Sequence, residues 1–574
     1  MNPVRPTPVA PLAAPTGLAG LGWVLLLILG VTAWRLLMAD LLPVMRDEAY
    51  YFDWAGRLAW GYFDHPPGVA LLGLGIRIEP SSTLAARLGT VAVGSASMLV
   101  LWRLYLASGL RPGNGLLLTL ILSVATFPGL VAGVIATPDT LLLLCWPLAL
   151  HEALRALQGQ RRRWLTAGLA TGLGLLGKYS MAMIGPVFLW ALVRADPRAL
   201  RTPWPYLGGL LALLAFTPNL LWNAHNDWLT LRFQFGHGFS TDSGPIRLAA
   251  DALPAVVGAQ ADALEPPRPM NWSERFSSLG GFIGAQLLFW GLLLVPIGSA
   301  LWRAGRGACQ GANERASQRP CWRVAGTRPT CDRATSTLDP AAVSLLGAAA
   351  LVPLGVFALV ALGSEVEANW AAPYLIGAAP FVALLLRRWA GDDRDRRWAS
   401  RWAGGWGLAA AAGNLVLISV YALYAITAFP PLPDAAGRVL RESRGFAELA
   451  DYAARLPAPV VADRYQFAAM LNFYQPQLAV SQWPGMTRPS EYGRGRIAPL
   501  PDPQALRQTG FWLLAHKFSP PQISGFDAVE TRSLYSCPDG RFTVIEGSAA
   551  REAGGCDDPA NVWQLYRYRA AAAP

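Results

Sequence analysis

The stretch GLGWVLLLILGVTAWRLLMA at residues 20–39 decides the fold class, because it is nearly uncharged and long enough to cross a hydrocarbon core as a helix. It runs on to Asp40 without a small-residue cleavage site, so we interpret it as a retained span and not as a signal peptide. Further apolar stretches follow near 84–104, 115–136, 139–157, 164–180, 181–194, 203–222, 279–302, 341–362, 371–387 and 404–428. The sequence therefore predicts a polytopic α-helical membrane protein with about 11–13 transmembrane helices.

The composition agrees with this interpretation and excludes other classes. The 574 residues are 53% hydrophobic and 15% charged, whereas soluble domains carry about 25% charged residues. An ordinary soluble enzyme and a disordered chain are excluded, and the continuous apolar runs exclude an outer-membrane barrel, whose strands alternate. The net charge of +11 comes mainly from arginines in short loops, where the positive-inside rule accounts for it. No nucleic-acid partner is expected.

Arginine-rich loops set the expected orientation. Alternating the spans places every cluster on one side, which the positive-inside rule makes cytoplasmic. The clusters are Arg5, Arg111, Arg161 to Arg163, Arg194 to Arg201, the arginines of 303–333 and the run Arg387 to Arg401. The opposite face receives loops 40–83 and 223–278 and the C-terminal tail. We therefore expect a transmembrane domain at 1–429 and an extracytoplasmic domain at 430–574.

The C-terminal tail is too long and too mixed in composition to be a linker. It predicts short strands at Val460–Ala462, Phe511–Ala515, Phe542–Ile545 and Val562–Tyr568, and a helix at Gln466–Phe473. A small α/β domain outside the membrane is the expected structure. Cys537 and Cys556 both lie in it, as either one disulfide or two free thiols.

Loop 40–83 contains two motifs that carry chemistry. They are Met45-Arg-Asp-Glu-Ala-Tyr-Tyr-Phe-Asp-Trp54 and Trp60-Gly-Tyr-Phe-Asp-His-Pro-Pro-Gly68. The first places Asp47 and Glu48 just after the first span, where acidic residues either mark the outer end of a helix or form a functional pair. The second is short and rigid and presents two groups able to bind metal or phosphate. Aromatic residues in both motifs predict a loop lying along the membrane surface.

Taken together, these features resemble glycosyltransferase family 39, which includes the dolichyl-phosphate-mannose-protein mannosyltransferases and the bacterial lipid A aminoarabinose transferase and has the GT-C membrane fold. Further similar segments are Ala136–Thr140, Gly177–Ser180, Pro218–Asn223, Phe233–Gly238 and Asn369–Pro373. The resemblance covers roughly residues 20–480. It implies a bacterial inner-membrane enzyme that moves a sugar, with inversion, from a polyprenyl-phosphate carrier to an amphipathic envelope acceptor on the periplasmic face. No nucleotide cofactor is implied.

The same resemblance assigns roles to individual residues. Asp47 matches the base that takes the acceptor's proton, and Glu48 matches the neighbour that supports it. The residues expected to face the substrate cavity are Asp139, Tyr51 and Asn223, and the candidate ligands of one divalent metal ion are Asp64 and His237. Two ligands from sequence cannot identify a metal. Asp139 has a second interpretation as the cap of its helix.

Lys178 stands out from the residues alone. It is one of two lysines among 48 basic residues and lies within an apolar stretch. A cation in a span costs at least ~2.5 kcal/mol unless it is partnered. One interpretation is a ligand of the donor phosphate, and the other is a side chain that snorkels to the outer interface. The other candidate phosphate ligands are Arg46, His65 and Tyr179.

Two other functions stay open at the level of sequence. In a transporter or lipid flippase, the acidic residues and Lys178 would form an ion path. In a non-catalytic assembly protein of envelope polysaccharide, they would have no chemical role. The sequence shows no repeat symmetry of the transporter type, and its polar groups gather at one face, which favours the enzyme. The sequence chooses neither the sugar nor the acceptor.

Overall fold

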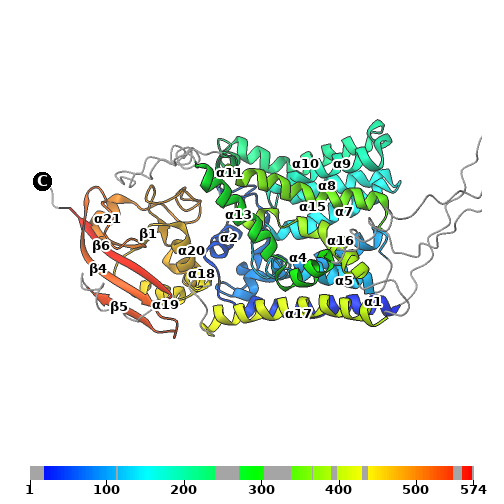
Figure 1. The fold of residues 1–574 in the computed structure, drawn as a ribbon. Coiled ribbons are helices and arrows are strands. Elements are labelled where there is room, and N and C mark those ends of the chain that lie inside the picture. Colours follow the sequence, from blue (N-terminus) through cyan, green and yellow to red (C-terminus); the bar gives the residue numbers. More distant parts are fainter. Residues whose placement is uncertain are drawn as a thin grey trace, which may run out of the picture.

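The computed structural model describes residues 18–110, 114–239, 270–302, 338–389, 397–429, 437–546 and 559–571, apart from Glu365. Long helices form one part of the molecule, and a domain with a curved sheet follows α17 at one end of them (Figure 1). Several features of the sequence fall outside the described residues: Arg5, Arg111, the arginines of 303–333 and Cys556. The side chains of Arg387 to Arg401 lie outside them as well.

Each predicted apolar stretch coincides with helix in the described ranges. The helices are α1 (Leu18–Leu41), α4 (Thr83–Ala107), α5 (Asn114–Val124), α6 (Phe127–Val131), α7 (Thr140–Leu157), α8 (Trp164–Leu175), α9 (Ile184–Ala195), α10 (Trp204–Ala224), α13 (Trp272–Leu288), α15 (Pro340–Ala361), α16 (Tyr374–Trp389) and α17 (Arg397–Thr427). Among these residues, six helices are long and apolar enough to cross a membrane singly. The pair Trp272–Leu288 and Gly291–Trp302, bent by 88°, has the form of a broken span or of a re-entrant loop. Shorter helices occupy the other predicted spans, so the chain is a multi-pass membrane protein.

One side chain satisfies the backbone at two breaks in these helices. α5 and α6 are separated by a break near Ala125, and the bent pair breaks at Gly291, whose φ is +53°. The buried Asn414 of α17 donates to the carbonyls of Ala125 and Trp290 at 2.8 and 2.9 Å and accepts the N–H of Leu292 at 2.8 Å. Unpaired backbone groups are very costly in hydrocarbon, so these bonds make both breaks tolerable.

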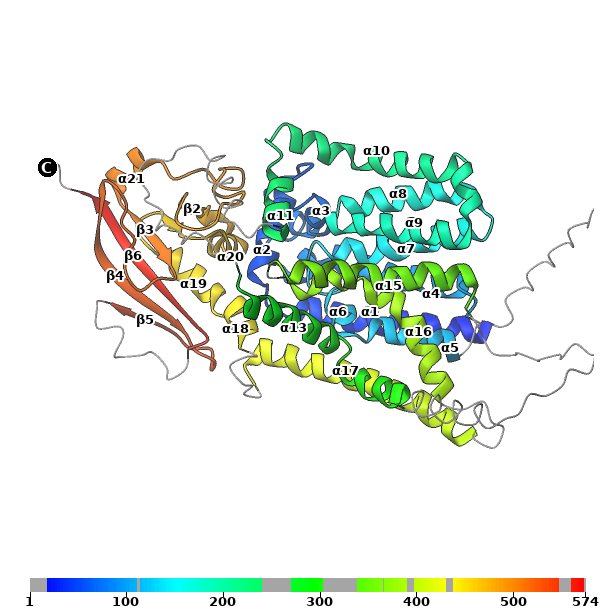
Figure 2. The same cartoon turned by 45° about the horizontal axis from the view of Figure 1, so that its top comes forward.

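Short helices lie at the end of the bundle that faces the C-terminal domain. Loop 40–83 folds into α2 (Arg46–Gly56), α3 (Gly68–Leu72) and the 3₁₀ turn η1 (Leu74–Arg77). The start of loop 223–278 forms α11 (Leu229–Phe239), and residues 240–269 lie outside the described ranges. Figure 2 shows α2, α3 and α11 together between the long helices and the sheet domain.

The C-terminal domain contains a six-stranded mixed sheet in the order β2-β1-β3-β6-β4-β5. β1 pairs in parallel with β2 and β3, and the remaining pairs are antiparallel. The strands are β1 (Val460–Ala462), β2 (Ser481–Gln482), β3 (Phe511–Ala515), β4 (Phe526–Ser536), β5 (Phe542–Glu546) and β6 (Asn561–Ala570), and the helices are α18 (Arg438–Ser443), α19 (Phe446–Ala453), α20 (Tyr465–Tyr474) and α21 (Pro503–Thr509). The small α/β domain is confirmed, with β2 and β4 as strands that the sequence did not predict. Cys537 is disulfide-bonded.

A continuous hydrophobic core joins α2 to the C-terminal domain. Tyr50, Phe52 and Trp54 of α2 are buried in the same cluster as Tyr465 and Phe473 of α20. The ring centroids of Tyr50 and Tyr465 are 4.5 Å apart, and those of Phe52 and Phe473 are 6.0 Å apart. Contacts between domains of one chain are usually more polar and allow relative motion. This apolar contact instead makes α2 and α20 one packed unit.

Candidate active site

The first turn of α2 places two carboxylates side by side. Met45 precedes the helix in an extended conformation, and Asp47 and Glu48 occupy its first turn, where the helix dipole stabilises negative charge. Glu48 Oε2 also accepts the N–H of Met45 at 3.2 Å, which satisfies a backbone group that the helix start leaves free. Consecutive helical residues point about 100° apart, so the two carboxylates face different surroundings.

Glu48 faces inward and is fully buried. Its carboxylate accepts two bonds from the buried Arg87, at 3.0 and 2.6 Å, and the N–H of Ala136 at 2.8 Å. The other N–H groups of Arg87 donate to the carbonyls of Ala39, Leu42 and Pro43. This pair ties the end of α1 to α2 and α4. Glu48 is therefore placed to support the site and not to meet a substrate.

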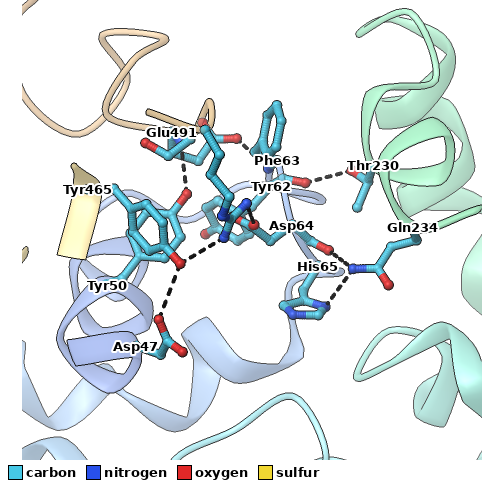
Figure 3. A network of polar contacts seen from close by, with 12 residues as sticks. Asp47, Tyr50, Tyr62, Phe63, Asp64, His65, Thr230, Gln234, Tyr465 and Glu491 are labelled. Carbon is cyan, nitrogen blue, oxygen red and sulfur yellow. Dashed lines mark hydrogen bonds and ion pairs between the residues drawn. The ribbon is translucent and has the colours of Figure 1, made fainter. Parts of the chain in front are cut away.

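Asp47 faces outward and is exposed to solvent, with Tyr465 of the C-terminal domain beside it (Figure 3). Its Oδ1 accepts the hydroxyl of Tyr465 at 3.3 Å and lies 3.5 Å from the amide nitrogen of Gln466. Desolvation by the surrounding protein raises the pKa of the Asp47 carboxyl, and the charge of Arg488 opposes that rise. A water-accessible carboxylate with a raised pKa is suited to accept a proton.

Asp64 and Arg488 form an ion pair beside Asp47. Arg488 lies between β2 and α21 and donates to Asp64 Oδ1 at 2.5 Å and to the hydroxyl oxygen of Tyr465 at 2.8 Å. Figure 3 shows Asp47, Asp64 and Tyr465 gathered around one space, linked by dashed contacts. The carboxylate of the second motif thus pairs with a cation from the C-terminal domain, and the charge of that cation also acts on Asp47.

The Asp-His-Pro-Pro segment and the two residues before it are held in place by two other parts of the chain, the C-terminal domain and α11. The carboxylate of Glu491 accepts the N–H of Phe63 at 2.6 Å, and Thr230 and Gln234 of α11 donate to the carbonyls of Tyr62 and Asp64 at 2.6 and 2.5 Å (Figure 3). The Gln234 amide also lies 3.4 Å from His65 Nδ1. These bonds fix the direction of His65, and the ring of Tyr51 lies 6.0 Å from the His65 ring, centroid to centroid.

Lys178 and Asp139 form the second polar group of the site. Lys178 lies between α8 and the turn before α9, is 8% exposed, and donates to both oxygens of Asp139 at 2.7 and 2.8 Å. Asn369 donates to Asp139 Oδ2 at 2.7 Å. Asp139 occupies the cap position of α7, but its side chain makes no capping bond. The carboxylate instead accepts bonds from Lys178 and Asn369, and the Lys178 ammonium is paired.

An apolar cavity of about 300 Å³ opens beside this polar group. Its lining residues include Thr126, Pro128, Thr137, Leu142, Phe289 and Ile376, with Asp139 and Asn369 among the polar ones. Neighbouring residues of the chain link the cavity to the carboxylates of α2 and to the Asp-His-Pro-Pro segment. Ala136, which donates to Glu48, precedes Thr137, and the N–H of Gly68 donates to Leu176, near Lys178, at 2.7 Å. The same part of the fold therefore holds both the apolar cavity and the helix that carries Asp47.

The remaining predicted residues are distributed around these two groups. Tyr179 donates to Asn219 at 3.0 Å, and Asn223 donates to the Tyr179 hydroxyl at 3.2 Å, so both belong to a hydrogen-bonded network at the end of α10. Arg46 is ion-paired with Glu442 of α18 at 2.8 Å. His237 lies in α11, but its side chain is outside the described residues.

The metal site of Asp64 and His237 stays a prediction, because the side chain of His237 lies outside the described residues. Asp64 Oδ1 is already paired with Arg488, and no group of three or more histidine, cysteine, aspartate or glutamate side chains lies together within the described ranges. Asp64 Oδ2 is buried without a hydrogen-bond partner, but one oxygen cannot define a metal site. Arg488 supplies positive charge beside Asp64.

Several residues of the site were not found from the sequence. Arg488, Tyr465 and Glu491 come from the C-terminal domain, far along the chain from the motifs that they contact. Arg87 is one of many arginines, and nothing in its local sequence marks it. Asn369 did carry a signal, because it begins the Asn-Trp-Ala-Ala-Pro segment that resembles the family.

Comparison with known proteins agrees with the class that this fold and site indicate. The chain has the fold of GT-C membrane glycosyltransferases. The crystal structure of ArnT from Cupriavidus metallidurans in the apo state superposes with a TM-score of 0.55 at 15% identity, covering 96% of this chain and 98% of ArnT. The structure of ArnT bound to undecaprenyl phosphate gives 0.53 at 15% identity, covering 92% and 98%.

Two sequence comparisons are more specific. Residues 64–222 match the family described as dolichyl-phosphate-mannose-protein mannosyltransferase. A stretch of 218 residues, 36% of this chain, is 28% identical to lipid A galacturonosyltransferase RgtD of Rhizobium johnstonii. That match spans 45% of the length of RgtD. The resemblance that the motifs indicated is confirmed over residues 64–222 by the family match, and for the fold by ArnT.

Proposed function

We propose that this protein is a membrane glycosyltransferase that moves a sugar from a polyprenyl-phosphate carrier to a hydroxyl group of an envelope acceptor. The observation that carries the proposal is Asp47, an exposed carboxylate with a raised pKa in a framework that also holds an apolar cavity with a polar end. Lipid A is named for RgtD and undecaprenyl phosphate for an ArnT structure, which supports a lipid acceptor and a polyprenyl-phosphate donor here.

In the proposed reaction, Asp47 takes the proton of the acceptor hydroxyl as its oxygen attacks the anomeric carbon. The bond between that carbon and the phosphate oxygen breaks, and its electron pair leaves on the phosphate. Attack from the face opposite the phosphate inverts the configuration. The chain's own cations stabilise the departing charge in a region with little water.

The donor would lie across the two polar groups of the site. Part of its polyprenyl chain would occupy the cavity of about 300 Å³, and the rest would lie in the bilayer. Its phosphate would meet Lys178, which now pairs with Asp139. Following the arginine distribution, we place this site and the C-terminal domain on the periplasmic face of the bacterial inner membrane.

Asp47→Asn tests the mechanism directly. The amide cannot accept the acceptor's proton, so turnover should fall by at least ~100-fold while the protein stays folded and inserted. The measurement is release of polyprenyl phosphate by purified protein from a labelled polyprenyl-phosphate sugar with an envelope-lipid acceptor. Asp40→Asn is the matched control, because Asp40 is also exposed at the end of the first span but contacts no site residue.

A wrong assignment of the base and a wrong assignment of the function would give different results. Turnover close to that of the wild type in Asp47→Asn would reject Asp47 as the base. No release by the wild-type protein with any polyprenyl-phosphate sugar, together with movement of the lipid across proteoliposome membranes, would instead favour a flippase.

A further inference from the structure

Arg488 enters the candidate active site from the C-terminal domain and is held firmly there. Its guanidinium lies over the rings of Tyr465 and Phe233, 4.6 and 5.2 Å from their centroids. Its two terminal nitrogens donate to Asp64 and to the hydroxyl oxygen of Tyr465. The side chain is still 32% exposed, so the charge is fixed in position and reachable from solvent.

The bond from Arg488 determines which way the Tyr465 hydroxyl points. A guanidinium can only donate, so the Tyr465 oxygen accepts, and its own O–H is left to donate to another acceptor. Asp47 Oδ1 lies 3.3 Å away and accepts it. The result is a directed chain from Arg488 through Tyr465 to Asp47. Oδ2 of Asp47 has no hydrogen-bond partner among the described residues, which leaves that oxygen to take a proton.

We propose that Arg488 is the positioning residue of the general base, because it makes Tyr465 hold one oxygen of Asp47 and leave the other for the acceptor's proton. The role rests on the proposed function, since it requires Asp47 to be the base. It also makes the C-terminal domain part of the catalytic site. A base that accepts a bond from a fixed donor is held in the productive orientation. This matters because small misplacements of a catalytic group lower the turnover rate strongly.

The charges around Asp47 give this role a pH signature. Arg488 lowers the pKa of Asp47, Glu442 of α18 and Asp64 raise it, and the Gln466 amide lowers it. The phenols of Tyr51 and Tyr465 also face the carboxylate. Removing Arg488 takes away the positive charge that opposes desolvation. The pKa of Asp47 should then rise, fewer molecules should carry the ionised base at a given pH, and the acid limb of the rate profile should move to higher pH.

The test compares Arg488→Ala, Arg488→Lys and Tyr465→Phe in the full-length protein. Arg488→Ala should lower kcat on the order of 10- to 100-fold, leave the donor KM unchanged and shift the acid limb to higher pH. Arg488→Lys should keep the acid limb in place but regain only part of kcat, because one ammonium does not reproduce the planar fork. Tyr465→Phe should lower kcat with a smaller pH shift, because Arg488 stays.

Arg496→Ala is the matched control for loosened docking of the domain. Arg496 comes from the same segment and donates to Asn226 across the domain boundary at 3.0 Å, but it does not reach Asp47. It should retain the kcat and pH profile of the wild type. Thermal unfolding of each variant reports whether it is folded. If Arg488→Ala does not fold, Tyr465→Phe still tests the chain of hydrogen bonds, because it removes the hydroxyl and keeps the packing of the ring.

A second readout separates this inference from the proposed function. Carbodiimide modifies protonated carboxyl groups, so the pH midpoint of Asp47 labelling, measured by mass spectrometry, reports its pKa without turnover. A higher midpoint in Arg488→Ala than in the wild type supports the coupling even if the wild type transfers no sugar, in which case the proposed function alone fails. Equal midpoints with a wild-type kcat, or an equal loss of kcat in Arg496→Ala, would overturn the role of Arg488.

Discussion

Two neighbouring carboxylates, Asp47 and Glu48, lie in opposite surroundings because one helical step turns them to different sides of α2. Glu48 meets a buried guanidinium and backbone N–H groups, which satisfy its charge completely. Asp47 meets water, a phenol and an amide, which leave part of its hydrogen-bonding capacity unused. The difference arises from position on α2 and not from residue type. A carboxylate whose charge is fully compensated stabilises structure, whereas one that is incompletely compensated can exchange a proton.

The ion pair between Lys178 and Asp139 determines how substitutions of Lys178 must be designed. The Lys178 ammonium neutralises Asp139, so Lys178→Ala would remove the proposed phosphate ligand and would also leave the Asp139 carboxylate without its cation. We expect donor affinity to fall by about 10-fold or more, the size of a lost charged hydrogen bond. Lys178→Arg should be partly active, since its fork does not match a compact ammonium. Donor titration of purified variants measures both effects.

The double variant Lys178→Met with Asp139→Asn separates the two roles of the lysine. It restores neutrality without a cation. Weak donor binding in the double variant is expected if Lys178 contacts the phosphate. Donor affinity equal to the wild type would show that the lysine serves only to neutralise Asp139. Lys517→Ala changes the other lysine of the chain, in the C-terminal domain, and should bind donor normally.

At the scale of elements, the Glu48–Arg87 pair holds α1, α2 and α4 together. Both side chains are fully buried, and breaking a buried pair leaves an uncompensated charge that costs about 3–5 kcal/mol. Arg87→Met should therefore lower the thermal unfolding temperature of the detergent-solubilised protein strongly. Turnover should fall with it, because the pair fixes the start of α2. Thermal scans with a tryptophan fluorescence readout make the measurement.

The compensating variant is Arg87→Met with Glu48→Gln. Replacing both charges by neutral groups of similar volume is often tolerated, so this double variant should be more stable than Arg87→Met alone. If Arg87→Met unfolds at the wild-type temperature, the pair does not hold these helices. Arg103→Met is a suitable control, because Arg103 lies on α4 but is exposed.

The sequence predicted the elements that local composition determines, and it missed elements that depend on pairing with distant parts of the chain. A membrane span needs only a long apolar run, and its local composition is enough to locate it. β4 was missed because Phe526–Ser536 is half exposed and carries Asp527, Glu530 and Arg532 without clean alternation. Its place in the sheet comes from pairing with β6 on one side and β5 on the other, which no local pattern encodes.

The site was predictable only where its residues lie in local motifs. Asp47, Asp64 and Lys178 stand out by charge and position near apolar runs. Arg488 and Tyr465 are an ordinary arginine and tyrosine in the C-terminal domain, and their significance appears only when that domain packs on α2. Lys178 was found, but its pairing with Asp139 requires two spans to lie together, which a single sequence does not establish.

At the scale of the whole molecule, the orientation in the membrane can be measured. The arginine distribution predicts that the C-terminal domain lies outside the cytoplasm. Alkaline phosphatase fused after Arg569 should be active, whereas the same enzyme fused after Gln160, in a predicted cytoplasmic loop, should be inactive. Activity only in the second fusion would mean that the predicted number of crossings is wrong by an odd number.

Asn414 makes the maturation of this molecule depend on its last span. During synthesis, the backbone near Ala125 and Gly291 is made well before Asn414, whose side chain satisfies its hydrogen-bonding groups. Until α17 enters the bilayer, those backbone groups must be satisfied by water, by lipid headgroups or by the insertion machinery, because hydrocarbon provides no partner. We therefore expect the earlier helices to form an assembly intermediate in which these backbone groups lack their final partner, and we expect insertion of α17 to supply it.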